Sequence, residues 1–194
     1  MNTTEQNTNA KSSQESNVEF AIFDPISVKG QGDSVTESIE VPSRNAIAIF
    51  KHNGESNFSV RQYDASFNRI GGLVNEIGVY HGSKLLISND KTIFEVTADG
   101  NWEIEIVPFF SIDSGSFDGE GAKVSGIFKA PNKGAWKIIH SGDSNFSVRL
   151  YSSKGRKGYV NEIGSYDGTV IVDFGIDTAF WVVEADGKWS IAPR

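Results

Sequence analysis

Residues 52–61 read HNGESNFSVR, and residues 140–149 read HSGDSNFSVR. Two further segments return in the same order: VNEIG at 74–78 and 160–164, and ADGxW at 98–102 and 185–189. The three offsets are 88, 86 and 87 residues, so the copies are collinear with almost no change in length. Because this period is far longer than the roughly 20–50 residues of solenoid and propeller repeats, each copy is interpreted as a small domain of its own.

The strand prediction rests on apolar residues at every second position within each copy. In residues 102–106 the side chains of Trp102, Ile104 and Ile106 alternate with two glutamates. A period of two places such residues on one face of a half-buried strand. Glycine-containing turns separate the runs, and no window shows a helical period. The sequence therefore predicts an all-β protein with two tandem antiparallel β-sandwich, jelly-roll-like domains related by internal duplication.

The domain boundaries follow from composition. We expect a disordered polar arm at 1–19, a first β-sandwich at 20–109, a Ser/Asp/Gly-rich linker at 110–116 and a second β-sandwich at 117–194. The arm has too little apolar surface to offset the entropy of ordering it. Structure should begin near residues 18–23, as a strand that enters the first domain or pairs with another partner.

Charge and composition exclude several classes of function. The chain has 18 Lys and Arg against 25 Asp and Glu, a net charge of −7, which opposes a phosphate backbone and argues against nucleic acid as a partner. No apolar run approaches the roughly 18 residues of a transmembrane segment, and the polar start is unlike a signal peptide. We expect a soluble protein whose location is open: extracellular or at the cell surface if the chain is a mature fragment. With no cysteine there are no disulfides or thiolate metal sites.

Four tryptophans and two histidines are expected to be structural. Trp102, Trp136, Trp181 and Trp189 are predicted to lie in the cores. His52 and His140 extend the inward-facing lines of their strands, and we interpret them as strand-end residues that bond to the backbone. Neither has a second histidine at metal-ligand spacing.

The candidate ligand-binding residues come from the VNEIG repeat and the tyrosine that follows it: Asn75, Glu76 and Tyr80, and again Asn161, Glu162 and Tyr166. Two interpretations are open. In one, the motif is a corner in which Asn satisfies local backbone groups, Val and Ile fill the core, and Glu points to water. In the other, the three residues form one side of a shallow polar and aromatic site for sugar hydroxyls. Calcium is a weaker variant, since it needs six to eight oxygens; no other cofactor and no metal site is expected.

Catalysis is not expected. General acid–base hydrolysis needs two opposed carboxylates with separated pKa values, whereas one well-placed carboxylate recurs in each copy. Asp33 has no acidic counterpart, because Ala122 takes its place. The Gly-x-Gly segments are not phosphate loops, because neither a helix pattern nor Gly-Lys-Ser/Thr follows.

Two resemblances to known domains add to this interpretation. Gly32-Asp33, the strand at 58–64 and the turn at 97–100 resemble bacterial β-sandwich accessory domains of the pre-peptidase C-terminal kind. The chain is more similar to uncharacterised bacterial tandem β-sandwich domains that carry V-N-x-I-G-x-Y-x-G followed by A-D-G-x-W. This second resemblance covers most of residues 28–192 and implies a β-sandwich fold and a surface-associated context, but no activity.

Two functions remain open. The first is a non-catalytic tandem binding module, for carbohydrate or a cell-envelope polymer, with a polysaccharide or a surface protein as its partner. The alternative is a structural or assembly protein that oligomerises through its N-terminal arm and its sheet edges. In that alternative the segment Phe20-Ala21-Ile22-Phe23 adds to a neighbour's sheet by main-chain hydrogen bonds.

Overall fold

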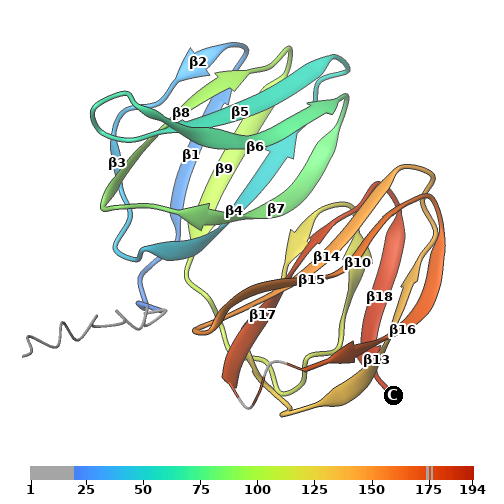
Figure 1. Cartoon of the computed structure of the whole chain (residues 1–194). Coiled ribbons are helices and arrows are strands. Elements are labelled where there is room, and N and C mark those ends of the chain that lie inside the picture. Colours follow the sequence, from blue (N-terminus) through green and yellow to red (C-terminus); the bar gives the residue numbers. More distant parts are fainter. Residues whose placement is uncertain (1–19, 174, 176) are drawn as a thin grey trace, which may run out of the picture.

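The computed structural model describes residues 20–173, 175 and 177–194, so the predicted arm at 1–19 lies outside the described residues. These residues fold into two β-sandwiches that lie side by side (Figure 1). The first sandwich is built from β1 Ile26–Gln31, β2 Ser34–Val35, β3 Ile39–Glu40, β4 Asn45–His52, β5 Asn57–Tyr63, β6 Arg69–Ile77, β7 Tyr80–Ile87, β8 Lys91–Thr97 and β9 Asn101–Val107.

The second sandwich repeats this order of strands. It is built from β10 Phe117–Glu120, β11 Lys123–Val124, β12 Phe128–Ala130, β13 Gly134–His140, β14 Asn145–Ser152, β15 Gly155–Ile163, β16 Tyr166–Val172, β17 Asp177–Glu184 and β18 Lys188–Pro193. The predicted linker holds no named strand, although Ser111 forms an isolated bridge with Ile127. Within the described ranges, no helix is long and apolar enough to span a membrane.

Each sandwich has the connectivity of a jelly roll. In the first, a four-stranded sheet in the order β1-β9-β4-β7 faces a five-stranded sheet in the order β2-β8-β5-β6, with β3 paired to β8. The second has β10-β18-β13-β16 and β11-β17-β14-β15, with β12 paired to β17. All pairs of named strands are antiparallel. The predicted fold class, two tandem antiparallel jelly-roll sandwiches, is confirmed.

The cores lie where the alternation predicts them. Trp102, Ile104 and Ile106 are buried between the sheets of the first sandwich, while Glu103 and Glu105 of the same strand face outward. Trp136, Trp181 and Trp189 are buried in the second core, so the predicted core tryptophans are confirmed.

The first described residues, 20–25, form no strand, so the expectation that a strand begins near residues 18–23 is wrong for them. Phe23 packs against the first core. Phe20 packs instead between the two domains, with ring centroids 5.0 Å from Phe109 and 6.2 Å from Phe180. Both aromatic side chains thus contact their own chain, which explains the irregular path of the segment.

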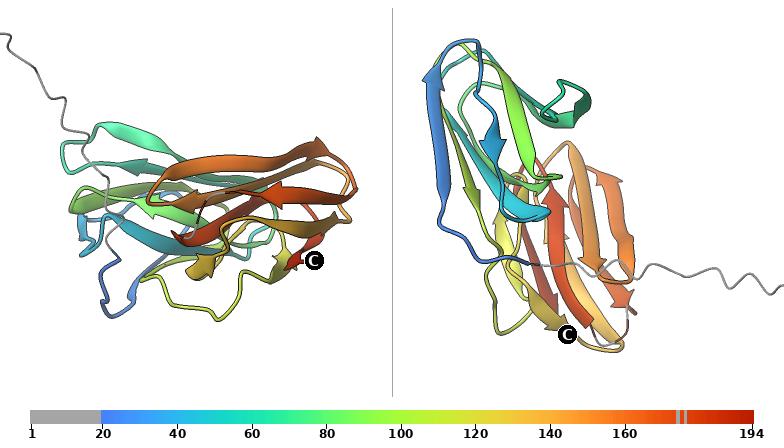
Figure 2. Two further views of the ribbon diagram at one scale, coloured as in Figure 1. Left: turned by 60° about the horizontal axis from the view of Figure 1, so that its bottom comes forward. Right: turned by 90° about the vertical axis from the view of Figure 1, so that its left-hand side faces the viewer.

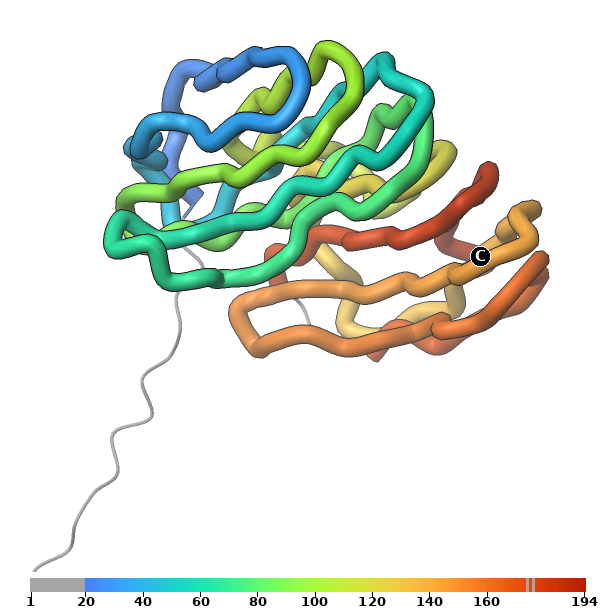
Figure 3. Tube along the Cα trace, turned by 90° about the horizontal axis from the view of Figure 1, so that it is seen from above, coloured from blue at the N-terminus to red at the C-terminus, as the bar shows by residue number. Residues whose placement is uncertain are grey.

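The sandwiches pack sheet against sheet in a head-to-tail order, as Figures 2 and 3 show from three directions. The outer face of the first four-stranded sheet contributes Ile47 and Ile49 of β4, Leu85 of β7 and Val107 of β9. The outer face of the second five-stranded sheet contributes Val124, Tyr151, Phe180 and Val182. Together with Phe20, Phe109 and Ile127, these residues form one apolar cluster, which we call the interdomain cluster.

Polar contacts fix the register of this packing. The backbone N–H of Ser83 in β7 donates to the carbonyl oxygen of Ala122 at 2.9 Å. The N–H of Val124 in turn donates to the Ser83 hydroxyl oxygen at 3.0 Å. Lys84 and Glu184 form an ion pair between the two sandwiches. The edge of the first domain is therefore held against β11 of the second.

Candidate functional site

Several of the repeated residues build a clamp at one end of each sandwich. Nδ1 of His52 donates to the carbonyl oxygen of Gly78 at 2.8 Å, and its Nε2 lies 3.2 Å from Oδ1 of Asp99. Oδ2 of Asp99 accepts hydrogen bonds from the backbone N–H groups of Glu55 and Ser56. The clamp therefore ties three segments together: the end of β4, the VNEIG turn and the ADG turn. The prediction that the histidine bonds to the backbone is confirmed.

The second sandwich repeats the clamp almost atom for atom. His140 donates to Gly164 at 2.8 Å and lies 3.3 Å from Asp186, whose other oxygen accepts from the N–H groups of Asp143 and Ser144. The imidazole stacks on Phe146 with centroids 4.2 Å apart, as that of His52 stacks on Phe58 at 4.5 Å. Both histidine side chains are fully buried.

The glycines of these motifs are required by the clamp. A Cβ at Gly54 would lie 2.1 Å from Oδ1 of Asp99, and one at Gly142 would lie 2.2 Å from Oδ1 of Asp186. Gly78 and Gly164 have φ values of +86° and +89°, which L side chains rarely adopt. The repetition of these positions follows from the geometry of the fold.

The predicted residues Asn75, Glu76, Asn161 and Glu162 are exposed in both copies. Val74 is buried, as expected, but Ile77 is 82% exposed, so the expectation that it fills the core is wrong, as it is for its counterpart Ile163, 84% exposed. The reason is the period of the strand: Val74 and Ile77 are three residues apart and lie on opposite faces. Glu76 pairs with the buried Phe58 and thus lies on the core-facing side of edge strand β6, at the open end of the sandwich.

Tyr80 and Tyr166 are partly buried and pack against the cores rather than standing free. Their rings lie 5.9 Å from Phe58 and 6.0 Å from Phe146, both at 45°. Each tyrosine ring lies over the glycine that follows it by two residues. A Cβ at Gly82 would lie 2.3 Å from the Tyr80 hydroxyl oxygen, and a Cβ at Gly168 would lie 2.2 Å from the Tyr166 hydroxyl oxygen. The Tyr80 hydroxyl is buried and has no hydrogen-bond partner among the described residues.

Two residues of the first triplet, but not Asn75, lie in a cleft. Glu76 and Tyr80 line a cleft of about 680 Å³ between the sandwiches, which we call the interdomain cleft. Its other polar walls come from both domains: His81, Glu120, Lys123, Ser144, Asn145, Glu184 and Asp186. Glu162 and Tyr166 lie at the equivalent end of the second sandwich and are not among the residues that line this cleft. The head-to-tail packing thus makes two similar triplets unequal.

Carboxylates dominate the interdomain cleft. Burial raises the pKa of Tyr80 well above its usual value, and the charges of Glu184 and Glu76 raise it further. Burial alone would also raise the pKa of Asp186, but its hydrogen bonds from Asp143 and Ser144 and the nearby His140 outweigh this, and the pKa is lowered. The tyrosine therefore keeps its proton and can donate a hydrogen bond, while Asp186 is held as an acceptor.

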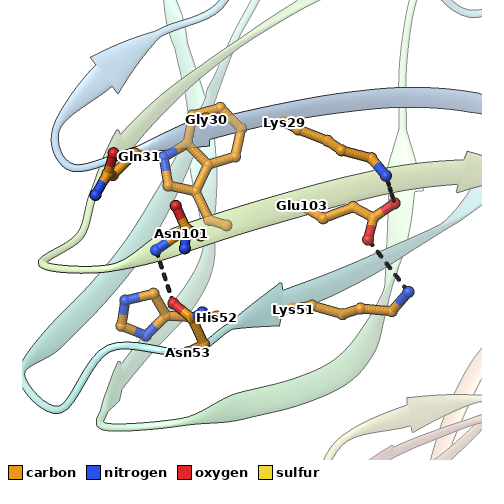
Figure 4. Close-up of a pocket in the computed structure, with 9 residues that line it drawn as sticks. Lys29, Gly30, Gln31, Lys51, His52, Asn53, Asn101 and Glu103 are labelled. Carbon is orange, nitrogen blue, oxygen red and sulfur yellow. Dashed lines mark hydrogen bonds and ion pairs between the residues drawn. The ribbon is translucent and has the colours of Figure 1, made fainter.

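A second concave surface, the sheet-face groove, lies on the outer face of β1, β9 and β4 and measures about 640 Å³ (Figure 4). Glu103 accepts from Lys29 at 3.0 Å and from Lys51 at 3.3 Å, while Asn53 accepts from the backbone N–H of Asn101 at 2.8 Å. Lys29, Lys51 and Glu103 correspond by the repeat to Asp118, Ile139 and Ser190, so this charge pattern is not duplicated. Since its ionic groups already satisfy one another, we favour the interdomain cleft.

Metal binding gains no support from the part of the chain that the structure describes. No group of three or more His, Asp or Glu side chains there is arranged to hold a metal ion. The calcium variant of the site therefore stays a prediction without a set of ligands.

Sequence reasoning missed part of the cleft for an identifiable reason. Glu184 of the cleft and its ion-pair partner Lys84 have Thr97 and Val170 as repeat counterparts, so a search for repeated residues passes over them. Asp99 and Asp186 were detectable, because an acidic residue before glycine is kept in both ADGxW segments.

Comparison with known proteins gives little further information. No family model matches the chain, and no curated protein matches it. A similar solved structure is the stem and receptor-binding domain of the spike protein P1 from bacteriophage PM2. It is 13% identical, and the match covers 98% of this chain and 81% of that one with a TM-score of 0.22. So low a score supports no argument about fold or function, and the resemblance to tandem bacterial domains stays a prediction.

Proposed function

We propose that the chain is a non-catalytic binding module that takes a neutral, polyhydroxylated ligand, such as a carbohydrate or a segment of a cell-envelope polymer, in the interdomain cleft. The observation that carries this proposal is the Tyr80 hydroxyl, buried at the cleft without a protein partner. A buried polar group without a partner costs free energy. The hydroxyl has no accessible surface in this structure, so binding must be accompanied by a movement that exposes it, after which a bound hydroxyl would recover that cost.

The chemistry of the cleft walls selects the class of ligand. Ionised carboxylates only accept hydrogen bonds, so Glu76, Glu120 and Glu184 favour ligands rich in O–H and N–H donors. Asn145 supplies an amide that donates and accepts at once. The cleft carries several carboxylates beside Lys123, and Lys84 is already paired with Glu184. Anionic polymers are therefore disfavoured by repulsion between like charges. Neutral hexose and N-acetylhexosamine oligomers fit this pattern.

The test is calorimetric titration of the full chain with neutral hexose oligomers, N-acetylhexosamine oligomers and uronic-acid oligomers. We expect a neutral oligomer to bind and Tyr80→Phe to weaken it by about threefold to tenfold, the effect of one net hydrogen bond. Tyr166→Phe is the matched control and should leave affinity unchanged at protein concentrations where the chain is monomeric. Equal losses in both variants, or binding confined to the uronic-acid oligomers, would contradict the proposal.

The alternative, assembly through the N-terminal arm, loses part of its basis. Phe20 and Phe23 already pack against their own chain, so a neighbouring sheet would have to compete for them. Residues 1–19, which the alternative also uses, lie outside the described residues. A truncation that tests the arm should therefore start at residue 20, because starting at Asp24 would also remove Phe20 from the interdomain cluster.

A further inference from the structure

The head-to-tail packing of the two sandwiches uses different faces of the two copies. The first copy contributes the outer face of its four-stranded sheet, and the second contributes the outer face of its five-stranded sheet. The second copy's four-stranded face and the first copy's five-stranded face take no part in this contact, and we call them the open faces, although Ile93, the repeat counterpart of Phe180, is only 4% exposed there. A contact between unlike faces of this kind is heterologous, so it does not produce a closed two-fold pair.

Several residues of the interdomain packing have similar repeat counterparts on the two open faces. Thr169 is the repeat counterpart of Ser83, and it preserves the hydroxyl that accepts a hydrogen bond from Val124. Val35, 59% exposed, is the counterpart of Val124, and Ile171, 54% exposed, is the counterpart of Leu85. Val35 and Ile171 on the open faces thus keep the apolar character of Val124 and Leu85, although they are exposed.

At three positions the open faces carry charge in place of apolar residues. Ile49 and Val107 of the interdomain cluster correspond to Lys137 and Arg194 on one open face, and Val182 corresponds to Glu95 on the other. Lys137 pairs with Asp167 on its own sheet. Glu95 lies 3.2 Å from Arg61 and accepts from the Tyr63 hydroxyl at 2.8 Å, contacts that lower the pKa of its carboxyl group. Lys137 on one face and Glu95 on the other are thus opposite charges, and each is already paired with a neighbour on its own sheet.

We propose that the chain associates with a second copy of itself, head to tail. The four-stranded face of the second sandwich (β10-β18-β13-β16) packs on the five-stranded face of the next copy's first sandwich (β2-β8-β5-β6). The contact repeats the geometry of the interdomain packing. In it, Lys137 and Glu95 take the positions that Ile49 and Val182 hold in the interdomain cluster. More polar than its internal counterpart, it is weaker and depends on salt.

Because the contact is heterologous, addition of copies produces linear arrays or rings rather than a closed two-fold dimer. Each addition also places another first sandwich beside Glu162 and Tyr166, which forms a second cleft between copies. This last consequence rests on the proposed function, whereas the association itself does not.

The test is sedimentation velocity of the full chain over a wide concentration range at low and high salt. We expect the weight-average sedimentation coefficient to rise with concentration, and less so at high salt. Glu95→Lys and Lys137→Glu should each weaken association by about tenfold or more, because like charges then face each other. Lys133→Glu, in an exposed turn of the second domain, makes the same change in net charge as Lys137→Glu and should have no effect.

Mixing the two single variants provides the decisive arm. In an equimolar mixture of Glu95→Lys and Lys137→Glu, unlike charges face each other at every contact between the two variants, so association should return to the wild-type level. Circular dichroism spectra and melting curves establish that each variant is folded. A wild-type chain that stays monomeric at every concentration would show that the open faces act as caps and overturn the proposal. Association that persists in both single variants would assign it to another surface and overturn it equally.

Discussion

Nε2 of His52 lies 3.2 Å from Oδ1 of Asp99, and the same contact joins His140 to Asp186 at 3.3 Å. In each pair a fully buried imidazole meets a partly exposed carboxylate that also accepts two backbone hydrogen bonds. The two pairs join the strand end, the VNEIG turn and the ADG turn of their domains.

The clamp carboxylates make the fold sensitive to acid. Burial would raise the pKa of Asp99, but the N–H groups of Glu55 and Ser56 and the charge of His52 outweigh it, so the pKa falls below the ordinary 3.8. A lowered pKa contributes stability that is present above pH 3.8 and lost as the pH falls through the folded-state value. We expect Asp99→Asn to flatten this loss in urea unfolding followed from pH about 2 to about 5. The linker variant Asp113→Asn is the control and should lose stability in acid as the wild type does. If Asp99→Asn showed this same dependence on pH, the role of the clamp would be contradicted.

The VNEIG turns depend on glycine. Gly78→Ala and Gly164→Ala should each lower the free energy of unfolding by about 1–2 kcal/mol, the cost of an L side chain in the left-handed region. Gly71→Ala is the control: a Cβ there meets no atom within 4 Å and the φ is ordinary, so a change below about 0.5 kcal/mol is expected. Denaturant unfolding measures all three. A similar loss in the control would remove the conformational explanation.

The indole N–H groups hold the entry turns of the two sandwiches. Trp102 donates to the carbonyl oxygen of Gly32 at 2.9 Å, and Trp189 donates to that of Gly121 at 2.8 Å. Replacement of either by Phe leaves a carbonyl without its partner, and we expect a loss of about 1–3 kcal/mol. Thermal or denaturant unfolding checks this; stability equal to wild type in both variants would mean that water replaces the bond at no cost.

Phe180 couples the two domains. Its ring lies 4.5 Å from Phe109 and 5.3 Å from Tyr151, within the interdomain cluster. Phe180→Ala should destabilise the chain by about 3–5 kcal/mol and separate unfolding into two transitions, one for each sandwich. Differential scanning calorimetry resolves the two; a single unshifted transition would show that the interdomain cluster does not couple the domains.

Variants of Glu76 and Glu162 test whether binding depends on the position of the glutamate in the cleft or on the VNEIG motif itself. Glu76→Gln should weaken binding of a neutral oligosaccharide by about threefold or more, because a charged acceptor is lost. Glu162→Gln should leave binding unchanged. Titration of both single variants and of the double variant checks this. If the double variant folds and binds as the wild type does, the loop plays no part in binding.

The sequence was sufficient to predict the strands, because period-two runs such as Trp102, Ile104 and Ile106 mark one buried face each. It was sufficient to predict that the histidines are structural, but not their partners, because Asp99 lies 47 residues after His52. The different surroundings of Glu76 and Glu162 could not be predicted from two nearly identical motifs. They arise from the packing of one sheet face on another, which depends on residues such as Val182 that differ between the copies.

The cleft is tested most directly by the amide chemical shifts of the isotope-labelled full chain during titration with the neutral oligosaccharide that binds best. We predict that the largest shifts occur on both sides of the interdomain cleft, at residues 76–81 of the first sandwich and at residues 144–145 and 184–186 of the second. Shifts confined to the sheet-face groove around Lys29 and Asn101, or to the second sandwich alone, would contradict a binding site between the domains.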